Sequence, residues 1–184
     1  MPDPNKILQG AERRKPEVEA SCVPQLRKPI RITRGFCISF DVDNESYLLA
    51  RGETSPTTLS AADFGAETGL PRILELLGRH RIPASFFIPA VSALLHAEMI
   101  PAILKSGRHE IRVHGWIHKY LPALSGEAEE ERLLHQAMDY LTKVTGKRPV
   151  GSGAYDQGSM FALTLHPHVS GQLALLHHLD QLLS

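Results

Sequence analysis

The sequence has few cysteines, no excess charge of either sign and no long apolar run. Only Cys22 and Cys37 are present in 184 residues, so the chain has no disulfide framework of the kind that stabilises small secreted domains. The 20 basic residues balance the 20 acidic ones, which argues against recognition of nucleic acid or an anionic membrane through bulk charge. No segment reaches the roughly 20 apolar residues of a membrane span. We expect a cytoplasmic protein without nucleic-acid or membrane partners.

What is present is the composition of an ordinary globular chain, with 42% hydrophobic and 22% charged residues. This length and composition allow one real core. Residues 1–34 are polar and rich in proline and charge, lack the apolar centre of a signal peptide, and are interpreted as an N-terminal arm. The predicted domain covers residues 35–184.

Within this domain, strand-like and helix-like patterns alternate. Residues 36–43 switch between apolar and polar side chains with the period of a strand, and residues 84–88, 109–114 and 161–165 also read as strands. Helical patterns follow at 70–77, at 101–107 and from about Gly171, whereas the stretch from Tyr47 to Phe64 reads as a long loop. This order predicts an α/β protein with a parallel sheet or barrel.

A further helix is predicted after Ser125, whose side chain is a suitable N-cap. Acidic residues occupy its first turns, as the helix dipole favours. Its expected buried stripe consists of Leu133, Leu134, Ala137, Leu141 and Val144.

Four side chains of metal-binding type are placed at predicted strand ends. Asp41 and Asp43 close the first strand, and His114 and His118 follow the third. In parallel α/β folds the functional residues gather at the carboxyl ends of strands. Two imidazoles one helical turn apart and a carboxylate from another strand supply three ligands and leave a position open for water, as in catalytic sites. An isolated pair of histidines at this spacing would more often be a surface pair; the joint placement favours a metal site with Asp43, His114 and His118 as ligands.

Five segments together resemble the polysaccharide deacetylase family, and most closely its branch of intracellular peptidoglycan-deacetylase-like, allantoinase-like and cyclic-imide-hydrolase-like members. These segments are residues 39–43 (SFDVD), 84–89 (ASFFIP), 107–111 (GRHEI), 114–118 (HGWIH) and 163–168 (LTLHPH).

The resemblance implies a set of roles for the matching residues. Asp43, His114 and His118 would hold Zn²⁺ or another divalent ion such as Co²⁺, Ni²⁺ or Mn²⁺. Asp41 would be the general base toward metal-bound water, and His166 the acid at the leaving nitrogen. Without the family pattern, a histidine such as His166 at the end of a strand is more often a hydrogen-bonded structural residue than a catalytic one.

The sequence departs from the family pattern between Val150 and Phe161. The family has an arginine-containing motif and several further strands there, whereas this chain has a short connector at residues 151–160. We therefore expect an incomplete (β/α)7-type deacetylase barrel with roughly four or five parallel strands. An arginine partner for Asp41 would be missing, and open sheet edges would favour a homo-oligomer.

Three functions are compatible with these observations. The first is metal-dependent hydrolysis of amide C–N bonds in N-acetylated sugars, as in polysaccharide deacetylases. The second is the same chemistry on a small-molecule substrate, as in an allantoinase-like or cyclic-imide hydrolase. The third is a catalytically impaired, truncated family member that binds metal or a sibling subunit; a purely structural fragment without metal ranks last.

Overall fold

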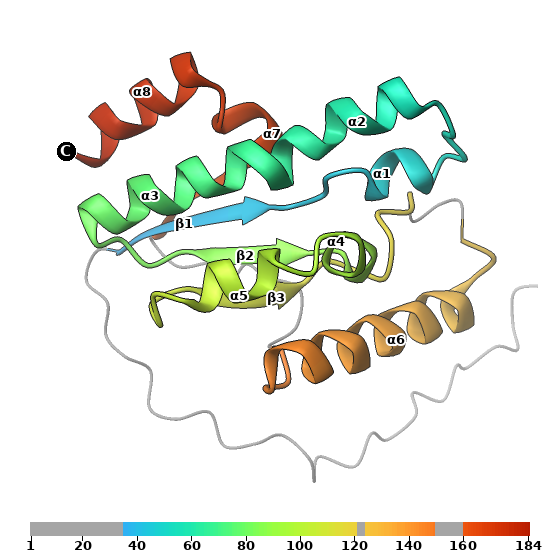
Figure 1. Ribbon diagram of the computed structural model, residues 1–184. Helices are drawn as coiled ribbons and strands as arrows, with labels where there is room; N and C mark the ends of the chain where they lie inside the picture. Colours follow the sequence, from blue (N-terminus) through green and yellow to red (C-terminus); the bar gives the residue numbers. More distant parts are fainter. Residues whose placement is uncertain (1–34, 121–123, 150–159) are drawn as a thin grey trace, which may run out of the picture. The chain divides into compact units, whose positions relative to one another are not determined.

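A four-stranded parallel sheet forms the centre of the domain (Figure 1). The computed structural model describes residues 35–120, 124–149 and 160–184. The strands are β1 (Gly35–Asp41), β2 (Ser85–Ile88), β3 (Glu110–Val113) and β4 (Met160–Leu165), in the spatial order β3-β2-β1-β4. Among the described residues no strand pairs with the outer edge of β3 or β4, so the barrel is not closed. The predicted open α/β fold with four or five strands is confirmed. The predicted arm and connector lie outside the described residues.

The two faces of the sheet differ in polarity, as the alternating sequence predicts. On β1, Ile38 and Phe40 are buried in the apolar core, together with Val42 just after the strand. The intervening Ser39 and Asp41 lie on the opposite face, where the Ser39 hydroxyl contacts that of Thr164 on β4 at 3.0 Å. The apolar face therefore anchors the sheet and leaves the other face free for polar chemistry.

The apolar face is covered by helices that follow the strands. Helix α3 (Leu70–His80) buries Leu70, Ile73, Leu76 and Leu77 at helical spacing, and it ends where Arg81 adopts a left-handed conformation with φ 57°. Helices α4 (Ala90–Leu95) and α5 (Met99–Leu104) follow β2, and α8 (Leu173–Leu183) contacts α3 (Figure 1). Within the described ranges, no helix is both long and apolar enough to span a bilayer.

The prediction of a long loop from Tyr47 to Phe64 is wrong. This segment contains most of α1 (Ser46–Leu49) and all of α2 (Pro56–Phe64), which continues into a π-helical turn, η2 (Gly65–Gly69). Pro56 stands at the first helical position, where its missing N–H is harmless. Only Ala62 of α2 is buried. Without an apolar stripe, the helix leaves no periodic signal in the sequence.

Helix α6 (Glu127–Thr145) forms where expected, but two details of its prediction are wrong. Its N-cap is Gly126, and Ser125 instead donates its N–H and its hydroxyl to the Glu129 carboxylate. Of the expected stripe, Ala137 and Leu141 are buried, whereas Leu134 and Val144 are each 41% exposed. Because β3 is the edge of the sheet beside α6, nothing in the described chain covers the rest of this stripe.

Close backbone packing joins η2 to α7 (Pro167–Ser170), the short helix that follows β4. A Cβ atom added to Gly69 would lie 2.3 Å from the Pro167 carbonyl oxygen. This is well inside van der Waals contact, and a backbone atom cannot rotate away. The contact fixes the start of α7 directly beside His166.

We expect Gly69→Ala to lower the free energy of unfolding by at least about 3 kcal/mol, at the upper end of overpacking effects. For a domain of this size this corresponds to a melting temperature about 6–12 °C lower. Gly78→Ala is the matched control, because nothing lies within 4 Å of an added Cβ in that helical position. It is expected to stabilise by about 0.5–1 kcal/mol. Equal melting temperatures for the two variants would contradict the packing described for Gly69.

Candidate metal centre

The carboxyl edge of the sheet brings together side chains from three strands. Asp41 is the last residue of β1 and Asp43 lies two residues further on. His114 directly follows β3, with His118 one helical turn's spacing beyond it, and His166 directly follows β4. All five predicted site residues therefore lie in one region, although they come from segments far apart in the sequence.

Asp43, His114 and His118 converge on one point. The Asp43 Oδ1 atom is 3.5 Å from His114 Nε2 and 3.9 Å from His118 Nε2. Both distances exceed the 2.7–3.2 Å of a hydrogen bond. They approach the separation of about 3.4 Å expected between two ligands bound tetrahedrally at 2.0–2.2 Å from one zinc ion. One ligand atom from each residue lies within 4.8 Å of the others.

The Asp43 carboxylate supplies an independent test of whether a cation fits. Asp43 is only 4% exposed, and its buried Oδ1 atom has no hydrogen-bond partner among the described residues. Leaving a buried anionic oxygen unpaired is costly. A divalent ion between the carboxylate and the two imidazoles would remove this cost, so the residues present fit such an ion.

Burial shifts the pKa values of two groups at this edge. Burial raises the pKa of the Asp41 carboxyl, and the Asp43 carboxylate adds to the rise against the opposing effect of the nearby histidines. Burial lowers the pKa of His114, more than the two aspartates raise it. A neutral imidazole is the form that binds a metal, so His114 is favoured in its ligand form at neutral pH.

His166 joins the same region from the opposite side of β1. Its Nε2 atom lies 3.4 Å from Asp43 Oδ2 and 3.9 Å from Asp41 Oδ2. The neighbouring His168 has its ring 5.5 Å from that of His166 and stacks on Tyr47 at 6.4 Å. His166 is thus within reach of both carboxylates, whereas His168 packs behind it.

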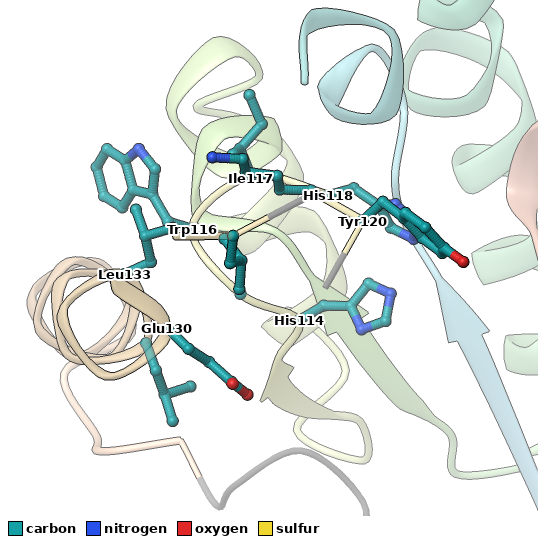
Figure 2. Close-up of a pocket in the computed structure, with 11 residues that line it drawn as sticks. His114, Trp116, Ile117, His118, Tyr120, Glu130 and Leu133 are labelled. Atoms are coloured by element: carbon teal, nitrogen blue, oxygen red, sulfur yellow. The ribbon is translucent and has the colours of Figure 1, made fainter. Parts of the chain in front are cut away.

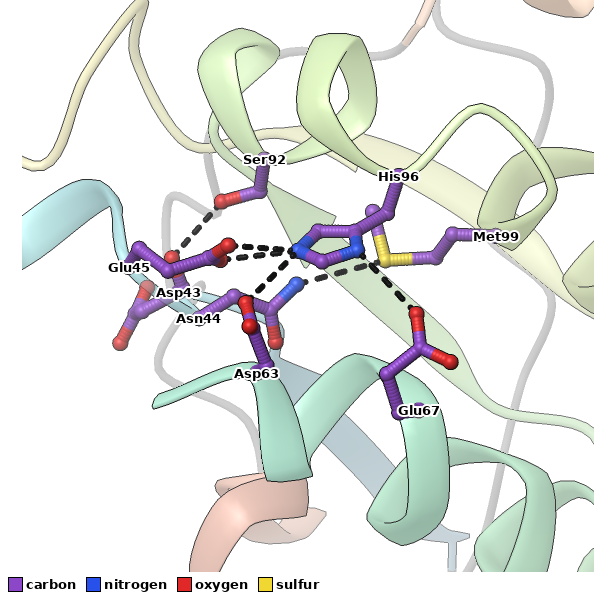
Figure 3. Close-up of polar contacts among 8 residues, drawn as sticks. All are labelled: Asp43, Asn44, Glu45, Asp63, Glu67, Ser92, His96 and Met99. Atoms are coloured by element: carbon purple, nitrogen blue, oxygen red, sulfur yellow. Dashed lines mark hydrogen bonds and ion pairs between the residues drawn. The ribbon is translucent and has the colours of Figure 1, made fainter. Parts of the chain in front are cut away.

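A second group of polar side chains was not anticipated from the sequence. Glu45, Asp63 and His96 lie close together beside the metal centre, with Glu67 at its margin (Figure 3). His96 Nε2 is 2.9 Å from both Glu45 carboxylate oxygens and 3.8 Å from Asp63 Oδ1. His96 stands at the C-cap of α4, and its side chain is largely buried. The members come from separate elements, so no spacing in the sequence indicates the cluster.

The pKa values in this cluster are strongly displaced. Burial of Glu45 opposes its ionisation, but hydrogen bonds with His96 and Asp63 outweigh it and lower the Glu45 pKa to about 2. The hydrogen bond with Glu45 raises the pKa of Asp63 to about 6 and also raises that of His96. Glu45 and His96 therefore form a charged pair around pH 5 to 6, between the ordinary pKa values of 4.5 for glutamate and 6.5 for histidine.

This pair gives a pH-dependent contribution to stability. The Glu45 contribution is fully present above pH 4.5 and is lost as the pH falls toward 2. The His96 contribution is fully present below pH 6.5 and is lost as the pH rises through its raised pKa. His96→Gln keeps a hydrogen-bond donor but cannot carry the positive charge, and only the loss of the charge makes its effect depend on pH. Between pH 4.5 and 6.5 the free energy of unfolding of His96→Gln should be lower than that of the wild type by on the order of 1 kcal/mol. This difference should shrink at higher pH.

Melting temperatures of both proteins between pH 4 and 9, measured with a chelator present, check this prediction. His135→Gln serves as the control, because His135 is exposed on α6. A His96→Gln deficit that does not change with pH would contradict the charged pair.

A cavity of about 510 Å³ lies between helix α6 and the segment that carries His114 and His118. Its walls are mainly apolar, with Trp116, Ile117 and Leu133 among them and Glu130 at one side (Figure 2). Figure 2 shows the His114 imidazole pointing away from Leu133 and Glu130. The cavity therefore lies behind the His114 imidazole, whose Nε2 atom faces Asp43 on the other side.

Taken together, the fold and the site define a (β/α)-barrel-type protein, open in the described residues, with an Asp-His-His group at the strand ends that could hold a metal ion. The sequence profile of the polysaccharide deacetylase family matches residues 52–165. The chain belongs to this family. The match includes both metal-centre histidines and begins after Asp43.

Comparison with curated relatives agrees with this assignment. The chain is 35% identical over 100 residues to a peptidoglycan deacetylase of Helicobacter pylori, which is 54% of this chain and 33% of that protein. It is 29% identical over 85 residues to a chitooligosaccharide deacetylase of Rhizobium leguminosarum, covering 46% of this chain and 35% of that protein. The aligned part thus spans about a third of each relative.

Solved structures share the fold. A protein described as a polysaccharide deacetylase from Mycobacterium smegmatis superposes with a TM-score of 0.69 at 21% identity, covering 81% of this chain and 82% of that one. An allantoinase superposes with a TM-score of 0.70 at 17% identity, covering 80% and 82%. These likenesses support the barrel-type fold of the described sheet.

Proposed function

We propose that this chain is a metal-dependent hydrolase of amide C–N bonds that acts on N-acetylated sugars. The observation that carries the proposal is the unpaired, buried Asp43 Oδ1 atom facing His114 and His118, with Asp41 and His166 close by. A ligand set with an open position and two adjacent proton-transfer groups is the arrangement that metal-assisted hydrolysis requires.

Each residue has a distinct role in this proposal. Asp43, His114 and His118 would hold a divalent ion, Zn²⁺ or alternatively Co²⁺, Ni²⁺ or Mn²⁺. Such an ion, when bound, lowers the pKa of water from 15.7 to about 7 and polarises the amide carbonyl. The Asp41 carboxylate, two residues from the proposed ligand Asp43, takes a proton from the attacking water. His166, on the other side of the carboxylates, donates a proton to the leaving nitrogen.

Two substrate classes follow from the comparisons. The Helicobacter pylori and Rhizobium leguminosarum relatives are named for deacetylation of peptidoglycan and of chitooligosaccharide, which favours N-acetylglucosamine polymers or oligomers. The structural likeness to an allantoinase makes a small cyclic or linear amide the second class. Both substrates need the same attack on an amide carbonyl, so the proposed roles of the residues do not change.

A metal-binding but catalytically impaired protein is the second candidate function. In the described residues no lysine or arginine pairs with Asp41; only His166 is within ion-pair distance of it. The general base therefore lacks a lysine or arginine partner to orient it, which should reduce turnover.

The sheet edges bear on the oligomeric state. No strand of the described residues pairs with the outer edge of β3 or β4; such open edges favour self-association, and we propose a homo-oligomer.

Hydrolysis assays with N-acetylglucosamine oligomers, allantoin and succinimide, each with and without a chelator, test the function. Release of acetate from the sugar, abolished by the chelator and restored by Zn²⁺, supports the first candidate. Hydrolysis of only the cyclic substrates moves the assignment to the second substrate class. Bound metal with no hydrolysis of any of the three identifies the impaired protein.

A further inference from the structure

The first turn of α4 touches both segments that carry the proposed metal ligands. The N–H groups of Ala90 and Val91 donate to the carbonyl oxygens of Gly115 and Trp116, at 3.0 and 2.9 Å. These two carbonyls lie between His114 and His118. The first N–H groups of a helix have no partner inside the helix, so α4 uses them to hold the histidine segment.

The next residue of the same turn holds the aspartate segment. Ser92 is completely buried, and its hydroxyl donates to the main-chain carbonyl of Asp43 at 2.7 Å (Figure 3). The same carbonyl accepts the N–H of Ser46 at 2.9 Å. Residues 90–92 thus bind the main chain on both sides of the metal centre.

The aspartate segment needs such support because of its own conformation. Asn44, next to Asp43, has a left-handed backbone with φ 46°, which is rare outside glycine and persists only where surrounding contacts impose it. The end of α4 and the start of α5 supply two of these contacts. His96 binds Glu45, and Met99 Sδ accepts a weak hydrogen bond from the Asn44 amide at 3.7 Å.

The Asp43 side chain supplies little of this support itself: within the described chain its Oδ1 atom has no hydrogen-bond partner, and its Oδ2 atom faces only the His166 imidazole, at 3.4 Å. The direction of the carboxylate is therefore set through the main chain, and Ser92 is the side chain that binds that main chain. We propose that Ser92 is a positioning residue for the metal centre: its bond to the Asp43 carbonyl sets the distance between this ligand and the histidines held by the same turn. This inference rests on the proposed metal site.

Ser92→Ala tests the proposal, with Ser46→Ala as the matched control. Both serines are completely buried near the same turn, but in the part of the chain that the structure describes the Ser46 hydroxyl has no hydrogen-bond partner. Metal-free proteins are titrated with Co²⁺ against a competing chelator, and the visible absorption of the bound ion is recorded. We expect Ser92→Ala to weaken binding on the order of 10-fold, as for residues that orient ligands from behind, and to change the absorption. Ser46→Ala should match the wild type in both.

The outcomes separate the inference from the function on which it rests. A wild-type protein that does not bind Co²⁺ overturns both. A folded Ser92→Ala protein with wild-type affinity and absorption overturns the positioning role alone. If Ser92→Ala does not fold, Ser92→Cys, which keeps the volume and a weaker donor, takes its place and should show weakened binding in a folded protein. If neither Ser92→Ala nor Ser92→Cys folds, the role of Ser92 is purely structural and the positioning role is overturned.

Discussion

Replacing His114 with alanine is expected to weaken divalent-metal binding by more than about 100-fold. Residues that only orient ligands typically account for 10–100-fold in affinity, and His114 would be a ligand itself. Its Nε2 atom lies 3.5 Å from the unpaired Asp43 oxygen, so its loss leaves one imidazole and one carboxylate. Hydrolysis of the N-acetylated substrate should fall to background at metal concentrations that saturate the wild type.

His135→Ala is the control for this experiment, because His135 is exposed on α6 outside the site. Metal affinity is measured by competition with a chelator, and folding by circular dichroism of the metal-free proteins. Wild-type metal affinity in a folded His114→Ala protein would remove His114 from the ligand set.

The second large effect is expected for Asp41→Asn. The amide has nearly the shape of the carboxylate but cannot accept a proton, so turnover should fall by about 10²–10⁴-fold, the usual contribution of a general base. Asp41 is not placed as a ligand, and metal binding should therefore stay within a few-fold of the wild type. The decisive readout is turnover at saturating metal, compared with Asp139→Asn on the exposed face of α6.

The pH profile of turnover adds an independent check on Asp41. Burial raises the pKa of this carboxyl, and the base acts only when it is ionised. The acidic limb of the profile should therefore follow the ionisation of Asp41 and should be absent from the residual activity of Asp41→Asn. Loss of metal together with loss of turnover in this variant would instead make Asp41 a ligand.

The strands, and the gathering of the candidate ligands at one edge of the sheet, could be predicted because simple rules determine them. Alternating side chains identify β1, and the shared carboxyl edge of parallel strands places Asp43 beside His114 without any structural information. The same reasoning anticipates the open sheet, since too few strand patterns are present to close a barrel.

Other features depend on tertiary contacts that leave no trace in the sequence. Helix α2 carries no apolar stripe, so it reads as a loop. Ser92 sits in an otherwise apolar helical stretch, and only the folded chain shows that its hydroxyl reaches Asp43. The Glu45 and His96 pair joins residues 51 positions apart, a distance at which spacing rules are silent.

Titration of the metal-free protein with Co²⁺ tests the central claim most directly, because it reports both the number of bound ions and their ligands. The account predicts saturation at one ion per chain, with the absorption of a site that contains imidazole nitrogens. In the double variant His114→Ala/His118→Ala this binding should disappear. No saturable binding by the wild type, or unchanged binding by the double variant, would contradict the assignment of Asp43, His114 and His118 as the metal centre.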